Sequence, residues 1–167
     1  MEQSYIIKYL RSPEKRRVRR ALMFLSKNVE RVEFTEELFS DIADKLNHDD
    51  WSIRSVALSS ITKFAIKDRK YLNASVDALK KAIEDDHPNV RSNALYNYLN
   101  LLSTYMDDMA ELAKEFVDKG LNDENNDVKV ASLTVLEFAS RNKLLDIGDY
   151  LPQIFEPVSY THLRAHE

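Results

Sequence analysis

The sequence contains no cysteine, only two glycines and only four prolines in 167 residues. The lack of cysteine excludes disulfide frameworks, zinc fingers and cysteine nucleophiles, because the side chains that they need are absent. The scarcity of glycine argues against β-sandwiches, barrels, Rossmann units and phosphate-binding loops, which place glycine wherever φ must be positive. Since turn-forming residues are rare and 31% of the residues are charged, we expect a helical protein.

Long apolar segments are missing as well. The longest purely apolar run is the five residues from Ala21 to Leu25, whereas a membrane-spanning helix needs ~20. The first residues also lack the basic and then apolar order of a signal peptide. We therefore expect a soluble, cytoplasmic protein that does not bind membranes.

What is present is a repeat. An acidic turn is followed by Val or Ile, then by Arg or Lys, and after two more residues by a small residue and Leu. The small residues that anchor successive copies are Ala21, Ala57, Ala94 and Ser132, with spacings of 36, 37 and 38 residues. A nearly constant period of this length indicates stacked supersecondary units.

Each copy continues into an apolar pattern of helical spacing, and a second amphipathic segment lies between the copies. Gly120 is expected at a left-handed C-cap, and Pro13 and Pro88 in the first turn of a second helix. The predicted helices cover residues 3–10, 13–27, 35–47, 50–66, 71–84, 88–104, 107–120, 125–141 and 149–156. The sequence therefore predicts helix pairs joined by short polar turns.

The repeated pattern resembles the HEAT repeat of α-solenoids. Three copies match at Ile53-Arg54, Val90-Arg91 and Val128-Lys129, whereas Val18-Arg19 of the first copy is one place out of register. The resemblance implies an all-α fold, a right-handed α-solenoid of about four antiparallel helix pairs. It also implies that Arg54, Arg91 and Lys129 tie one turn to the next through an Asp–Arg ladder. Tetratricopeptide repeats compete less well, because their Trp, Gly, Tyr and Pro positions are missing.

The last ten residues, 158–167, break the helical pattern and hold two of the four histidines. They resemble one reading frame through a transposase-type sequencing adapter. We therefore predict two parts. Residues 1–157 form a HEAT-like domain that is the N-terminal fragment of a longer protein, and residues 158–167 are a non-native tail.

The exposed side of the second helices, on the concave face of a solenoid, is the predicted binding surface. Asn93, Asn97 and Asn100 stand out there, because asparagine is a poor helix former. Together with Tyr96, these amides would contact a protein or peptide partner, and the alternative is a solvated face without a partner. The positions expected to be exposed are Arg20, Met23, Phe24, Lys27, Val56, Ser59, Ser60, Lys63, Asn93, Tyr96, Asn97, Asn100, Ala131, Thr134, Val135 and Phe138.

Charge is unevenly distributed. Residues 1–32 carry a net charge of +6 and residues 33–157 carry −10, counted from the sequence. The basic cluster at Arg11, Lys15, Arg16, Arg17, Arg19 and Arg20 would meet an acidic partner or phosphate. Candidate contacts here are Arg16, Arg17, Arg20 and Lys27. A second hypothesis is therefore a nucleic-acid-associated protein, for example one similar to the HEAT-like DNA glycosylases, although such proteins usually carry positive charge over the whole domain.

Catalytic signatures are weak. His48 is followed by Asp49 and His87 by Pro88, so the His-Glu motifs of HEAT-like di-iron hydroxylases are missing outside the tail. Trp51 lies among acidic residues, unlike the tryptophans of a basic glycosylase cleft. No serine has the glycine-flanked setting of a nucleophile elbow. We expect a monomeric, non-catalytic scaffold that holds no metal or cofactor.

Overall fold

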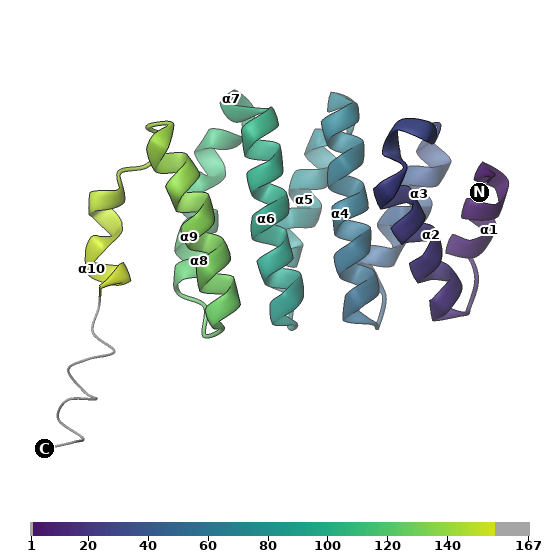
Figure 1. Ribbon diagram of the computed structural model, residues 1–167, viewed down its shortest axis with the longest axis horizontal. Helices are drawn as coiled ribbons and strands as arrows, with labels where there is room; N and C mark the ends of the chain where they lie inside the picture. The colour runs from purple at the N-terminus through teal and green to yellow at the C-terminus, as the bar shows by residue number, and fades with distance from the viewer. Residues whose placement is uncertain (1, 156–167) are drawn as a thin grey trace, which may run out of the picture.

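The computed structural model describes residues 2–155, which form helices and no strand (Figure 1). The α-helices are α1 (Gln3–Leu10), α2 (Lys15–Lys27), α3 (Glu36–Asp44), α4 (Trp51–Lys67), α5 (Leu72–Ala82), α6 (Pro88–Thr104), α7 (Met106–Met109), α8 (Ala113–Leu121), α9 (Asn126–Arg141) and α10 (Leu151–Ile154). Short 3-10 helices are η1 (Val29–Arg31), η2 (Lys45–Asn47), η3 (Arg69–Tyr71), η4 (Ala110–Leu112) and η5 (Ile147–Tyr150). Each predicted helix has a counterpart, and the segment predicted at 107–120 is divided into α7, η4 and α8.

Capping side chains set the starts of four long helices. Each accepts a hydrogen bond from a free backbone N–H group of the first turn, which stabilises a helix by about 1 kcal/mol. The caps of α3, α4, α6 and α9 are Thr35, Asp50, His87 and Asn125. Pro88 occupies the first turn of α6 as predicted. The prediction for Pro13 is wrong, because α2 begins two residues later, at Lys15.

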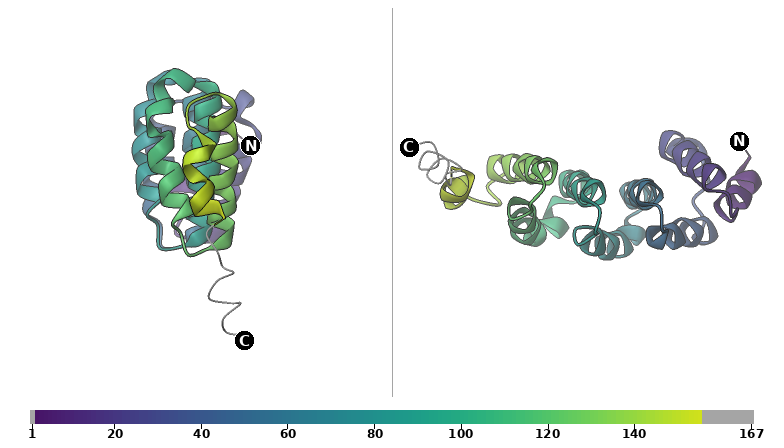
Figure 2. Two further views of the ribbon diagram at one scale, coloured as in Figure 1. Left: turned by 90° about the vertical axis from the view of Figure 1, so that its left-hand side faces the viewer. Right: turned by 90° about the horizontal axis from the view of Figure 1, so that it is seen from below.

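The helix pairs stack into two rows. The second helices α2, α4, α6 and α9 pack on one another in sequence order, and each also contacts the first helix of its own pair. Seen from below, the rows follow a gentle arc with the second helices on its inner side (Figure 2, right). The predicted α-solenoid of antiparallel helix pairs is confirmed.

The core runs between the two rows as one continuous cluster. Leu58 and Leu95, two leucines of the repeated pattern, are fully buried, which contributes ~1.5–3 kcal/mol for each side chain. Leu133, at the equivalent position of the next copy, differs from them, because 36% of this residue is exposed. The ring of Tyr98 stacks on Phe116, and its hydroxyl donates to a backbone carbonyl, so this large buried side chain is also satisfied at its polar end.

The prediction that Gly120 forms a left-handed C-cap is wrong. Gly120 lies within α8, and no glycine of residues 2–155 has a positive φ. A Cβ added at Gly120 would lie 2.4 Å from Cβ of Ser132 and 2.9 Å from Cδ1 of Leu95. The Ser132 hydroxyl donates to the carbonyl of Val117 in α8 at 2.7 Å. Gly120 and Ser132 are therefore small because α8 approaches α9 closely within one pair.

The predicted division at residue 157 and the adapter-like tail at 158–167 lie outside the described residues. Both stay predictions.

Candidate partner-binding surface

An arginine ladder joins the connections between first and second helices. Arg54 of α4 donates to both carboxylate oxygens of Asp85, at 2.9 and 3.0 Å. Arg91 of α6 repeats this bidentate contact with Asp123, at 2.7 and 3.0 Å. Each arginine also donates to two backbone carbonyls of its own connection. The predicted ladder is confirmed at these two steps, whereas Lys129 makes no ion pair with a residue of the described range.

The ladder starts one repeat earlier than predicted. Arg19 of α2 donates to the Asp50 carboxylate at 3.1 Å and to the Ser52 hydroxyl at 2.8 Å. From the sequence, Arg19 was expected only as a member of the basic cluster. Its position 35 residues before Arg54 is the signal that could have revealed it, since this spacing is close to the repeat period.

Hydrogen bonding keeps the acids of the ladder charged. Burial acts to raise the pKa of Asp85, but hydrogen bonds from Arg54 and from a backbone N–H outweigh it and hold the pKa below the ordinary 3.8. The pKa of Asp123 is lowered in the same way, with burial opposed by Arg91. For Asp50 the main cause of the lowered pKa is the hydrogen bond from the Ser52 hydroxyl. These charges serve the stacking of repeats.

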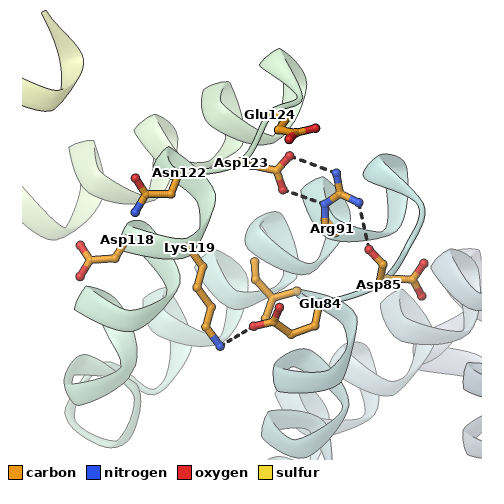
Figure 3. A pocket seen from close by; sticks show the side chains of 9 residues that line it. Glu84, Asp85, Arg91, Asp118, Lys119, Asn122, Asp123 and Glu124 are labelled. Carbon is orange, nitrogen blue, oxygen red and sulfur yellow. Dashed lines mark hydrogen bonds and ion pairs between the residues drawn. The ribbon is translucent and has the colours of Figure 1, made fainter. Parts of the chain in front are cut away.

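An open hollow of about 530 Å³ lies beside the last step of the ladder (Figure 3). Its wall contains the Arg91–Asp123 pair and an ion pair between Lys119 and Glu84 at 2.7 Å. Because both cations of the wall are held by neighbouring carboxylates, we assign the hollow to the packing of successive repeats. Within residues 2–155 no group of three His, Cys, Asp or Glu side chains is placed to hold a metal ion.

The histidines and the tryptophan belong to the same connections. Nδ1 of His48 accepts from the backbone N–H of Asp50 at 2.9 Å, and Nδ1 of His87 accepts from that of Asn89 at 3.1 Å. The Trp51 ring stacks on the His87 ring with centroids 4.1 Å apart. All three side chains therefore shape the starts of α4 and α6.

The three asparagines of α6 differ in their contacts: Asn93 and Asn97 bond to α4, whereas Asn100 is exposed. The Asn93 amide of α6 donates to the carbonyl and hydroxyl of Ser55 and to the hydroxyl of Ser59 on α4. Asn97 is only 5% exposed, and its amide donates to Ser59 and to the Asn93 carbonyl. The expectation that Asn97 is exposed is wrong, because its side chain turns sideways into the α4–α6 contact. We call Asn93 and Asn97 with these serines the amide clasp.

Tyr96 and Asn100 point outward from the same helix. Tyr96 is 41% exposed and Asn100 is exposed, so both are available to a partner. Among the other positions expected on this face, Arg20, Met23 and Lys27 are also exposed. Three more expectations of exposure are wrong because the residues are buried in helix contacts: Ser60, Ala131 and Val135.

Ion pairs also divide the basic cluster. Arg11 contacts Glu37 and Asp41 across the first and second pairs, at 2.8 and 3.1 Å. Arg17 pairs with Glu14 at 3.0 Å, and Lys15 reaches Asp49 at 3.8 Å. Three of the predicted contacts, Arg16, Arg20 and Lys27, have no ion pair with the rest of residues 2–155. The cluster is thus partly structural and partly free.

A stack of helix pairs, with first and second helices in separate rows and with a ladder of charged side chains between successive pairs, defines an α-solenoid of the HEAT and armadillo type. The family model described as the adaptin N terminal region matches residues 6–160. The chain belongs to this family. None of the helices within residues 2–155 is long and apolar enough to cross a membrane.

Solved structures share the fold at low sequence identity. The N-terminal domain of MAST/Orbit has a TM-score of 0.62 at 13% identity, covering 93% of this chain and 74% of that one. A designed armadillo repeat protein gives 0.59 at 18% identity, covering 81% and 63%. A computationally designed armadillo repeat protein for modular peptide recognition gives 0.57 at 16% identity, covering 79% and 62%. The chain thus spans a little under two thirds of the designed proteins' length. No curated protein sequence matches it.

Proposed function

We propose that the chain is a non-catalytic scaffold whose second-helix surface binds a protein or peptide partner. One observation carries this proposal: at the centre of that surface, on α4 and α6, every charged side chain is already bonded within the chain. Its four charged side chains are Arg54, Lys63, Lys67 and Arg91. Each of them donates to another helix or connection. Apart from Lys67, the exposed side chains of these two helices are neutral, as at the centre of protein interfaces, where charged residues are depleted and tyrosine is enriched.

Within this surface we assign direct contact with the partner to Tyr96 and Asn100. Both are exposed on α6, and a tyrosine offers a rigid apolar ring with a polar end. Asn93 and Asn97 hold α6 against α4 and so fix the shape on which Tyr96 is presented.

The comparisons support this proposal. The fold is shared with repeat proteins designed for modular peptide recognition, and solenoids of this type present extended inner surfaces to their partners. We also propose that the scaffold is monomeric and cytoplasmic, as expected from the sequence. The nucleic-acid hypothesis has less support, because Arg11, Arg17 and Arg19 are neutralised by carboxylates of the chain itself.

The test is selection of peptides from a displayed random library against the purified chain, followed by affinity measurement by fluorescence anisotropy. Tyr96→Ala combined with Asn100→Arg should weaken the selected peptides by at least about tenfold, since a buried tyrosine anchor is a typical hot spot. Asn73→Arg on α5, in the outer row, is the matched control and should leave affinity unchanged. Equal binding to all three proteins, or failure to select any peptide, would remove the second-helix surface from consideration.

A further inference from the structure

One row of exposed side chains follows α2 along its length. Arg16, Arg20, Met23 and Lys27 are separated by four, three and four residues, which places them on one face of the helix. The opposite face is buried and consists of Val18, Ala21, Leu22 and Leu25. We call the four exposed residues the α2 stripe.

The cations of the α2 stripe differ from the other basic residues around them. Arg11, Lys15, Arg17 and Arg19 are all within ion-pair distance of a carboxylate. Arg16, Arg20 and Lys27 make neither an ion pair nor a side-chain hydrogen bond with any of residues 2–155. Their charge is therefore not neutralised by the chain, and it gives this end of the solenoid a local positive potential.

The α2 stripe borders the neutral surface of α4 and α6. Helix α2 packs on α4 in the inner row of the arc (Figure 2), and the stripe faces away from the core. Met23, which is 44% exposed, adds an apolar and adaptable contact between Arg20 and Lys27. A partner lying on the neutral surface would therefore reach three free cations and one apolar side chain at its α2 end.

We propose that the α2 stripe binds an acidic segment of a protein partner, with carboxylates on Arg16, Arg20 and Lys27 and an apolar side chain on Met23. This inference rests on the proposed function and names the chemical class of its partner. Residues 16 to 27 rise by about 16 Å along a helix. An extended segment of about five residues covers that distance.

A nucleic acid fits this surface less well than an acidic peptide. Residues 33–157 carry a net charge of −10 by count, so a phosphate backbone that extended beyond α2 would meet repulsion. A short acidic segment meets the stripe alone and continues onto neutral residues. Charge complementarity therefore favours a peptide whose acidic part is confined to one end.

The experiment uses the full chain and three labelled probes at low salt. The first probe is a peptide with glutamates and an embedded leucine at one end, and the second has glutamine in place of each glutamate. The third is a duplex DNA oligonucleotide. We expect the glutamate peptide to bind at least about tenfold more tightly than the glutamine peptide, because close charge pairs contribute strongly at low salt. Arg20→Glu combined with Lys27→Glu should abolish that preference.

The matched control is Lys80→Glu combined with Lys143→Glu, two exposed lysines outside the second-helix surface with the same change of net charge. It should retain the preference, and melting curves should show that both double variants fold. Equal binding of the two peptides would overturn acidic recognition and leave the proposed function standing. Tighter binding of DNA than of the glutamate peptide would overturn the inference, as would binding of neither peptide. Loss of preference in the lysine control would show a general charge effect and would also overturn it.

Discussion

Basic side chains have different roles in two regions of the molecule. One region is the row of connections between first and second helices, which we call the connection edge, and the other is the second-helix surface. At the connection edge Arg54 and Asp85 bury most of their side chains and satisfy each other, with exposed side-chain fractions of 15% and 14%. On the α2 stripe Arg16, Arg20 and Lys27 are exposed and make no ion pair with any carboxylate of residues 2–155. The difference teaches that pairing, and not residue type, separates cations that build the stack from cations that are free for a partner.

The largest effect on stability is expected at the close contact between α8 and α9. Gly120→Val should lower the free energy of unfolding by about 3 kcal/mol or more, because any Cβ collides with Ser132 and Leu95. Urea unfolding followed by circular dichroism measures it. Gly148→Val is the matched control, since a Cβ there comes within 3.4 Å of only a flexible carboxylate oxygen of Asp146. Similar losses for both variants would contradict the close approach of α8 and α9.

The next effect comes from the ladder itself. Arg91→Ala should lower the free energy of unfolding by about 2 kcal/mol, because Asp123 would keep its charge at 11% side-chain exposure without its bidentate partner. Lys129→Ala, at the equivalent position of the next repeat, should change stability by less than about 0.5 kcal/mol. Both variants are measured by thermal and urea unfolding. Equal losses of stability for Arg91→Ala and Lys129→Ala would contradict the distinction between paired and free cations.

The ladder also predicts a dependence on pH. The pKa values of Asp85 and Asp123 are lowered in the folded chain, so the stability that they contribute is complete above the ordinary 3.8. It is lost as the pH falls through the lower folded-state values, because protonation removes the charge that each arginine binds. Stability of wild type and of the Asp85→Asn, Asp123→Asn variant, measured by urea unfolding from pH 7 to pH 2, should therefore converge at the acid end. A constant difference between them would contradict this account.

The amide clasp is expected to contribute less to stability than the arginine ladder and more than the α2 stripe. Asn93→Ala should cost about 1 kcal/mol, the usual net value of lost hydrogen bonds, because three bonds to α4 disappear. Asn100→Ala, three residues from the buried Asn97 on the same helix, should be neutral within about 0.5 kcal/mol. Differential scanning calorimetry of the two variants would reveal whether the clasp is structural, and a neutral Asn93→Ala would show that it is not.

The smallest effect is expected on the α2 stripe. Arg20→Ala and Lys27→Ala should leave the melting temperature unchanged, because neither side chain bonds to the described part of the chain. A clear drop in melting temperature would show that these cations also build the stack.

The sequence predicted the helix pairs and their order because the signals are local. The apolar period, the acidic turn and the caps at Asp50 and Asn125 depend on neighbours within one turn of helix. The site was harder to predict, since one residue step turns a helix by about 100°. A modest difference in how α6 rotates against α4 decides whether Asn97 faces solvent or Ser59. The pairing of Arg19 likewise depends on an acid 31 residues away, and its detection needs the exact register of two repeats.

The arginine ladder runs in one direction only. Arg19, Arg54 and Arg91 all reach forward to the following connection, over 31, 31 and 32 residues. Each of the connections at Asp50 and Asp85 receives a contact from behind and is followed by an arginine that makes one ahead. A whole unit copied into the middle of the chain would therefore bring both halves of its bonds with it. Such a chain can lengthen or shorten by duplication or deletion of complete units without leaving a buried charge alone.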